Sequence, residues 1–250
     1  GRDGRFFTVT GNQMGALLLD YVIRAAREAG TLTPDDYAVK SIVSTDMADC
    51  ICKKQGVRLY SVPTGFKYIG EVIKNYESEG KPGRFLIGFE ESYGYLFGTY
   101  ARDKDAVGAA LMICEMTAWY AEKGMTLGDA LEALYAEYGL YREGLIDIYM
   151  EGYDGIEKRK RTMAKLRENT PVSIGGVKVK AAADFASGTE RVIATGEEHP
   201  SALSGLDVLF YTMENDDKIV VRPSGTEPKI KMYLLCHGDD AESLARKIDA

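Results

Sequence analysis

The sequence predicts an α/β protein: a three-layer α/β domain with a mixed, largely parallel sheet, followed by a smaller α+β domain with an antiparallel sheet. Three observations support this class. Helix-like and strand-like segments alternate through the first half of the chain. Apolar residues at every second position dominate after Val172. The length of 250 residues suits one large domain or two modest ones.

The first half of the chain begins with a predicted helix from Asn12 to Gly30. Its apolar residues recur at spacings of three and four, and Asn12 can cap its start. Short apolar runs predict strands at 38–43, 57–62 and 84–88. Further helices are expected at 44–56, 68–78, 105–123 and 126–138. Loops are expected at 63–67 and 89–104, both at the carboxyl ends of strands, where α/β sheets bind ligands.

The second half changes in pattern beyond Gly152. A run of charges at 157–161 predicts an amphipathic connecting helix, and we interpret those charges as solvated. A tight turn at 214–217 between two strand-like runs predicts a hairpin. Strands are expected at 177–179, 191–195, 206–213, 218–222 and 229–236, and a last helix from Asp240.

Composition excludes several classes of function. Lys plus Arg number 31 and Asp plus Glu number 38, so the formal charge of −7 disfavours a nucleic-acid surface but allows a small anion site. The four cysteines are too scattered for a disulfide framework or a zinc site; we expect them to be packing residues in a cytoplasmic protein. No apolar run approaches the ~20 residues that span a bilayer, so no membrane partner is expected.

The segment from Arg222 to Pro228 is the sharpest local feature. Arg222, Ser224, Gly225 and Thr226 combine a guanidinium, two hydroxyls and an open backbone, which together can surround a phosphate. An ordinary connecting turn is the alternative interpretation, because Pro, Ser and Gly are the usual turn residues.

Three further loops carry polar groups. Glu90 and Ser92 follow the third strand and suit sugar hydroxyls, although a solvated acidic loop would have the same composition. Lys104, between two aspartates, can place a cation over a transferring phosphoryl group or can belong to a surface ion-pair cluster. The segment Thr64-Gly65-Phe66-Lys67 supplies a hydroxyl, an open backbone and a cation.

Taken together, these four loops resemble those of the α-D-phosphohexomutase family, the phosphoglucomutases and phosphomannomutases. The resemblance implies that residues 1–11 are the tail of the family's second domain. It implies that 12–152 form the third domain, which recognises the sugar, and that 153–250 form a linker helix and the fourth domain, which binds phosphate. It also implies substrate-binding roles for Thr64, Gly65, Lys67, Glu90, Ser92, Arg222, Ser224, Gly225 and Thr226, and a catalytic role for Lys104.

The family's reaction interconverts a hexose 1-phosphate and a hexose 6-phosphate through a bisphosphate intermediate and a phosphoserine. The sequence has no counterpart of the phosphoserine loop or of the aspartate-rich Mg²⁺ loop. We therefore expect the N-terminal domains of the same polypeptide to be missing, Mg²⁺ to have no ligand here, and a glucose 1,6-bisphosphate-type activator to serve the full enzyme. The chain alone is expected to bind a phosphorylated hexose without turnover. The alternatives are a non-catalytic phosphosugar-binding module and an unrelated α/β structural protein.

Overall fold

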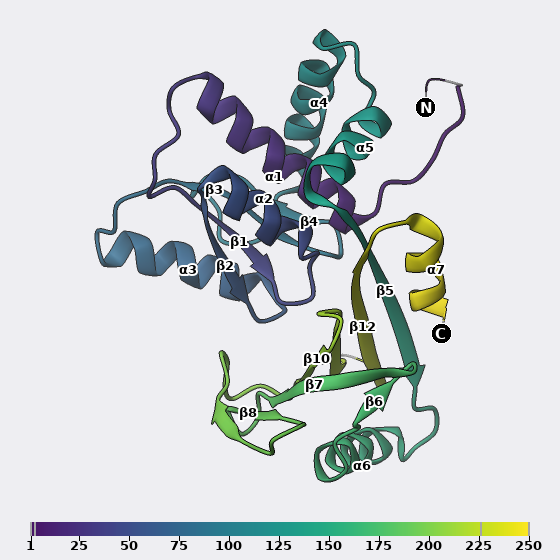
Figure 1. Cartoon of the computed structure of the whole chain (residues 1–250). Coiled ribbons are helices and arrows are strands. Elements are labelled where there is room, and N and C mark those ends of the chain that lie inside the picture. Colours follow the sequence, from purple (N-terminus) through teal and green to yellow (C-terminus); the bar gives the residue numbers. More distant parts are fainter. Residues whose placement is uncertain (1, 3, 226, 250) are drawn as a thin grey trace. The chain divides into compact units, whose positions relative to one another are not determined.

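The chain divides into two compact units, Gly1–Tyr141 and Arg142–Ala250. The computed structural model describes residues 2, 4–225 and 227–249 (Figure 1). The division falls near the start of β5 (Leu140–Tyr149), ahead of the expected junction near residue 152. The reason is that β5 lies beside β12 (Lys229–Gly238) in the second sheet, so the chain joins the second unit before the charged helix begins.

The first unit contains a four-stranded mixed sheet with the order β2-β1-β3-β4. β1 (Tyr37–Ser41) pairs in parallel with both β2 (Arg58–Val62) and β3 (Phe85–Glu90). β4 (Gly94–Leu96) pairs antiparallel with β3. The largely parallel sheet is therefore confirmed, but the expectation of a single loop over 89–104 was wrong. A three-residue strand carries too little periodicity to be found without its partner.

Helices cover both faces of this sheet. α3 (Phe66–Ser78) packs on one face, against Tyr37 and Val39 of β1. The opposite face, which includes Ala38, packs in one hydrophobic cluster with the remaining helices of the unit. These are α1 (Gly11–Glu28), α2 (Met47–Gln55), α4 (Ala106–Glu122) and α5 (Leu127–Tyr138). The alternation of neighbouring β1 residues between two clusters follows from the two-residue period of a strand.

The cap of α1 differs from the expected one. Thr10, not Asn12, is the N-cap: its side chain accepts a hydrogen bond from the Gln13 N–H, and Gln13 Oε1 accepts one from the Thr10 N–H at 2.9 Å. Asn12 is buried, and its Oδ1 accepts a hydrogen bond from the Thr45 N–H at 2.9 Å. Asn12 therefore links α1 to the loop after β1.

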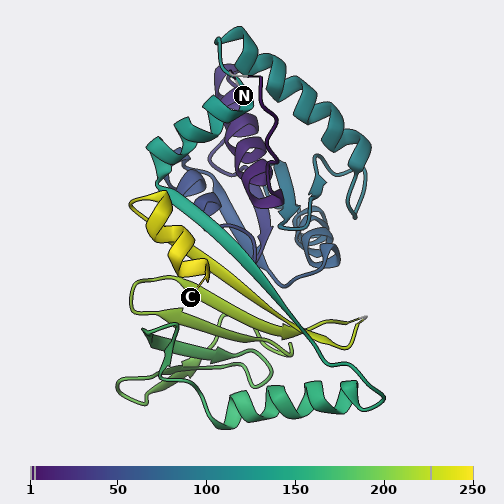
Figure 2. The ribbon, with the colours of Figure 1, turned by 90° about the vertical axis from the view of Figure 1, so that its right-hand side faces the viewer.

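The second unit is built on an eight-stranded sheet, as far as the structure describes it, with the order β5-β12-β11-β10-β7-β8-β9 and β6 paired to β7. The predicted hairpin is confirmed, because β10 (Leu209–Met213) and β11 (Lys218–Pro223) pair antiparallel. The other strands are β6 (Ser173–Ile174), β7 (Val177–Asp184), β8 (Thr189–Val192) and β9 (Glu198–Pro200). α6 (Gly155–Glu168) packs against β11 and β12, and α7 (Ala241–Asp249) lies along β12 (Figure 2).

The burial of the cysteines tests whether they are packing residues, and the helices test whether any of them can span a membrane. Cys52 and Cys236 are buried and Cys50 is half-buried, as packing residues would be. Cys114 is exposed on α4, so the expectation that all four are packing residues was wrong for this one. None of the helices that the structure describes is long and apolar enough to cross a bilayer.

Candidate functional site

Glu90 joins two of the predicted loops. It ends β3, it is only 8% exposed, and its Oε1 accepts a hydrogen bond from the Gly65 N–H at 2.7 Å. Gly65 is the N-cap of α3, where a φ of 120° favours glycine. The carboxylate therefore lies at the positive end of the helix dipole. The parallel strands β2 and β3 both flank β1, so the segments after them meet at one edge of the sheet.

Lys104 packs beside this pair. A Cβ on Gly94 would lie 2.7 Å from Lys104 Cδ and 3.4 Å from Glu90 Oε2, so the missing side chain is what allows the lysine to lie there. Lys104 Nζ is 5.3 Å from the centre of the Phe66 ring. The ammonium also lies 2.9 Å from Asp103 Oδ1, and hydrogen bonds from Lys104 lower the pKa of Asp103. Because the Lys104 side chain is 51% exposed, its charge is accessible to a ligand.

The other predicted residues of the first unit lie around this cluster. Thr64 is half-buried in the short turn that precedes α3. Lys67 lies in the first turn of α3, so the predicted loop 63–67 was too long by two residues. The Lys67 side chain is exposed, and its Nζ is 4.8 Å from the centre of the Tyr68 ring. The Lys67 ammonium therefore lies beside the Tyr68 ring, and no contact between Lys67 and Glu90 is seen among the described residues.

Ser92 lies exposed in the turn between β3 and β4. The next residue, Tyr93, has a φ of 63°, a left-handed conformation that costs a non-glycine residue roughly 1 kcal/mol. The neighbouring Glu91 accepts a hydrogen bond from Ser41 Oγ at 3.2 Å. Of the two adjacent glutamates, Glu90 thus bonds to Gly65 after β2, and Glu91 bonds to Ser41 of β1.

Arg222 lies at the end of β11 in the second unit. Its Nη2 donates a hydrogen bond to Tyr233 Oη at 3.1 Å, and its guanidinium is 5.7 Å from the centre of the Tyr233 ring. Its buried Nε makes no hydrogen bond within the part of the chain that the structure describes. Ser224 is buried and Gly225 is exposed, with open space where a Cβ would be. Thr226 lies outside the described residues.

The loop after Arg222 is anchored by two cations that the sequence interpretation missed. The Lys229 ammonium is buried and lies 2.9 Å from Glu227 Oε2 and 3.0 Å from Asp147 Oδ2. These contacts, with Glu227 first, raise the pKa of Lys229. Arg159 Nη1 on α6 donates to the Ser224 carbonyl oxygen at 2.6 Å and to the Glu227 carbonyl oxygen at 3.1 Å.

The position of Arg159 corrects the interpretation that the whole run 157–161 is solvated. Arg159 is half-buried, whereas the other four residues of the run are exposed. It lies four residues after Gly155 and four before Met163, both of which are buried. Helical spacing places these three residues on one face, so the sequence carried a signal for an inward-facing Arg159.

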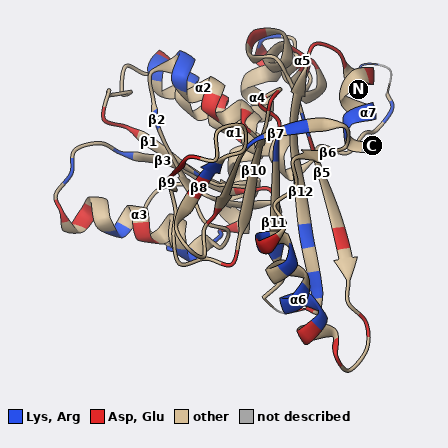
Figure 3. Cartoon of the chain, turned by 60° about the horizontal axis from the view of Figure 1, so that its bottom comes forward, with Lys and Arg blue, Asp and Glu red and all other residues tan. Residues whose placement is uncertain are grey.

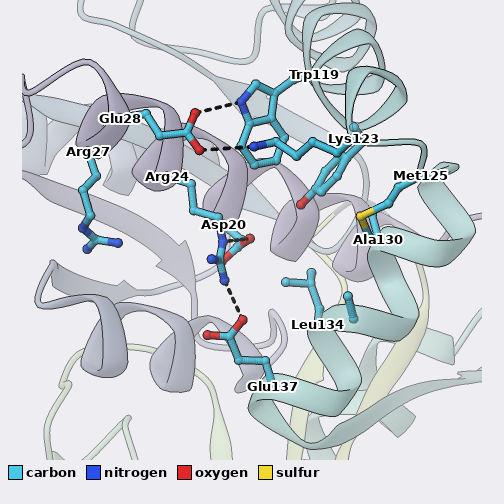
Figure 4. A pocket seen from close by; sticks show the side chains of 12 residues that line it. Asp20, Arg24, Arg27, Glu28, Trp119, Lys123, Met125, Ala130, Leu134 and Glu137 are labelled. Atoms are coloured by element: carbon cyan, nitrogen blue, oxygen red, sulfur yellow. Dashed lines mark hydrogen bonds and ion pairs between the residues drawn. The ribbon is translucent and has the colours of Figure 1, made fainter.

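A cavity of about 350 Å³ between α1, α4 and α5 contains none of the predicted site residues (Figure 4). Most of its charged side chains bond to groups of the same lining, and Arg27 bonds to Gln55. Arg24 Nη2 lies 2.6 Å from Glu137 Oε2, and Glu28 accepts hydrogen bonds from Trp119 Nε1 and Lys123 Nζ at 3.1 and 3.3 Å. These internal pairs explain the polar lining without a ligand.

Comparison with known proteins gives consistent results. Residues 10–138 match the profile of phosphoglucomutase/phosphomannomutase, alpha/beta/alpha domain III. A phosphoglucomutase of Staphylococcus epidermidis is 34% identical over 247 residues, which are 99% of this chain and 44% of that protein. A phosphoglucomutase of Staphylococcus aureus is 34% identical over an alignment of 252 positions, which covers 99% of this chain and 43% of that protein. The chain thus spans less than half the length of these relatives.

Solved structures are similar in fold. The pp63/parafusin phosphoglucomutase of Paramecium, in an open form, superimposes with a TM-score of 0.65 at 17% identity and covers 98% of this chain and 40% of that one. An N-acetylphosphoglucosamine mutase of Aspergillus fumigatus, in complex with GlcNAc-6P and magnesium, gives a TM-score of 0.51 at 13% identity, with coverages of 99% and 44%. At these identities the likeness concerns the fold alone.

Proposed function

The chain belongs to the phosphoglucomutase/phosphomannomutase family, and we propose that it is the substrate-binding half of a phosphohexomutase. The parent enzyme then interconverts a hexose 1-phosphate and a hexose 6-phosphate. In this proposal the first unit includes the family's sugar-recognition domain, and the second unit is its phosphate-binding domain. The observation that carries the proposal is the meeting of three loops at Glu90, Gly65 and Lys104.

The sugar contacts are assigned to the first unit. One oxygen of the buried Glu90 carboxylate is held by the Gly65 N–H, and its remaining lone pairs can accept hydrogen bonds from vicinal sugar hydroxyls. Ser92 and Thr64 add hydroxyl groups near the same sheet edge. The exposed ammonium of Lys104 is suited to stabilise the transferring phosphoryl group or to move a proton, and Lys67 is a second candidate cation.

The non-reacting phosphate is assigned to the loop of the second unit. Arg222 offers a planar guanidinium whose buried Nε has no hydrogen bond within the described residues. Ser224 and Gly225 extend the loop, and Thr226 belongs to the proposal on the sequence alone. A fixed guanidinium together with backbone N–H groups is a general means of holding an anion.

The reactive phosphoserine, Mg²⁺ and a glucose 1,6-bisphosphate-type activator belong to the parent enzyme. Among the described residues, no three His, Cys, Asp or Glu side chains come together as metal ligands. The proposal assigns the Mg²⁺ ligands to the rest of the parent enzyme, and it gives this chain roles in holding substrate, in stabilising the transferring phosphoryl group or in moving a proton. A cytoplasmic location, expected from the cysteine usage, is part of the same proposal.

Binding of glucose 6-phosphate to the chain tests the proposal. We expect isothermal titration calorimetry to detect binding. Glu90→Gln and Arg222→Met should each weaken it about tenfold or more, because each removes a charge-assisted hydrogen bond worth about 1.5–3 kcal/mol. Glu122→Gln, an exposed carboxylate on α4, is the matched control and should bind as the unmodified chain does.

The same preparation tests whether the chain alone lacks mutase activity. With Mg²⁺ and glucose 1,6-bisphosphate added, the chain should produce no glucose 6-phosphate from glucose 1-phosphate in a coupled assay. Sustained turnover would contradict the assignment as half of an enzyme. Absence of glucose 6-phosphate binding, or equal affinities for Glu90→Gln and Glu122→Gln, would contradict the assigned site.

A further inference from the structure

The loop between β11 and β12 is held from behind by one side chain. Arg159 Nη1 donates to the carbonyl oxygens of Ser224 and Glu227, on either side of the tip of the loop. Two carbonyl groups of the loop are thereby turned toward α6. Hydrogen bonds from a charged donor are about twice as strong as neutral ones, so this contact restrains the backbone.

The orientation of one peptide group follows from that contact. The peptide bonds of the described residues are trans. In a trans peptide the C=O and the following N–H point in opposite directions. Because the Ser224 C=O points at Arg159, the Gly225 N–H points away from α6. Gly225 is exposed, so this part of the loop is accessible to an anion.

Among the described residues, Arg159 is the one side chain that bonds to this peptide group. Gly225 has no side chain, and a Cβ there would meet nothing within 4 Å. Glycine permits backbone conformations that other residues do not, so the Ser224–Gly225 peptide could rotate if Arg159 were removed. Ser224 itself is fixed, because its N–H donates to the Lys229 carbonyl oxygen at 2.9 Å. The effect of Arg159 is therefore concentrated on Gly225.

Several Lys and Arg residues follow one another along α6, which is largely blue in Figure 3. Lys158 pairs with Asp154 at 2.9 Å and Lys160 with Glu157 at 3.0 Å, both along the helix surface. Arg161 is exposed. Within the run 157–161, Arg159 is thus distinguished by its burial and by its two backbone acceptors.

We propose that Arg159 is a positioning residue of the phosphate loop, which fixes the Ser224–Gly225 peptide so that the Gly225 N–H is presented to the bound phosphate. The inference rests on the proposed function for the identity of the ligand. The claim that Arg159 orders the loop is independent of the proposed function. Arg159 itself contacts the loop backbone and acts on the anion through Gly225.

The test compares Arg159→Met and Arg159→Lys with Arg161→Met as the matched control. Without ligand, the {¹H}-¹⁵N NOE and the amide exchange rate of Gly225 report the order of the peptide group. Arg159→Met should lower that NOE and raise that exchange rate, and it should weaken binding of glucose 6-phosphate and inorganic phosphate about fivefold to tenfold. Arg159→Lys should recover part of both effects, because an ammonium keeps the positive charge and its N–H donors but lacks the rigid planar fork of a guanidinium. Arg161→Met should match the unmodified chain.

The two readouts separate the inference from the proposed function. Unchanged Gly225 exchange in Arg159→Met overturns the inference whatever the chain binds, provided that the far-UV circular dichroism spectrum shows a folded variant. Unchanged phosphate affinity with a loosened Gly225 overturns it as well. If the unmodified chain binds no phosphosugar, the proposed function fails, and the Gly225 measurements then decide whether Arg159 orders the loop.

Discussion

The carboxylate of Glu90 is buried at the edge of a sheet, which is costly for an ionised group unless it is hydrogen-bonded. The Gly65 N–H supplies one bond, and the Lys104 side chain lies beside it over Gly94. The position of a charged side chain also depends on the residues packed against it. Gly94 is such a residue, because its lack of a side chain makes room for the lysine.

Gly94→Ala is therefore expected to displace Lys104. The new methyl group would lie 2.7 Å from Lys104 Cδ, too close to remain, and the flexible lysine would move away. We expect the affinity for glucose 6-phosphate to fall several-fold, while the free energy of unfolding changes by less than ~1 kcal/mol. Calorimetric titration and urea unfolding measure the two quantities. Lys104→Met serves as the comparison, and unaltered affinity in Gly94→Ala would show that the position of the lysine is unimportant.

At the scale of single elements, α5 illustrates how capping couples to pH. Thr126 caps the helix, and Asp129 Oδ2 accepts hydrogen bonds from the Thr126 N–H at 2.7 Å and from Thr126 Oγ1 at 2.8 Å. These bonds, the backbone one first, lower the pKa of Asp129 to about 2, with a further contribution from Arg2. The part of the cap that the Asp129 carboxylate supplies therefore contributes its full stability only while Asp129 is ionised.

The pH dependence of this cap has a definite sign. The folded pKa of about 2 is below the usual aspartate value of about 4, so the unfolded chain binds a proton first as the pH falls. The stabilisation is complete above about pH 4 and is lost between about pH 4 and about 2. Urea unfolding measures the difference in the free energy of unfolding between the unmodified chain and Asp129→Asn. This difference should be smaller at pH 3 than at pH 6.5. An advantage of equal size at both pH values would contradict this account.

The elements also show which features were readable in the sequence. The capping box of α1 is present as Thr10-x-x-Gln13, and spacing alone could have selected it over Asn12. The helices 126–138 and 105–123 were predicted within one residue at each end, because their caps and apolar residues are local signals. β4 was not predicted. Its three residues become a strand through pairing with β3, and this pairing is not visible in the residues of β4 themselves.

The whole molecule is acidic, with a formal charge of −7, and several of its cations pair with particular partners. In the charged run 157–161 of α6, Arg159 bonds to loop carbonyls, and Lys158 and Lys160 pair with acidic residues. A nucleic-acid surface needs a continuous set of free cations to neutralise phosphates. Such a surface is not expected here.

We therefore expect no measurable binding to duplex DNA or to RNA at 150 mM salt. Fluorescence anisotropy with labelled oligonucleotides should give dissociation constants weaker than about 100 µM, the weak end of non-specific association. A basic protein of similar size serves as the positive control. Micromolar affinity that weakens steeply with salt would show that the charge run is an interface.

The sequence by itself determined the alternation of strands and helices, the change to antiparallel pairing, and the polar composition of the segments around Gly65, Glu90, Lys104 and Arg222. These features depend on residues a few positions apart, through periodicity, caps and turns. Only the tertiary structure decided that Glu90 bonds to Gly65, that Lys104 lies over Gly94 whereas Lys67 lies by Tyr68, and that Arg159 faces the loop after Arg222. Those contacts follow from strand order and helix packing, which bring together residues that are distant in the chain.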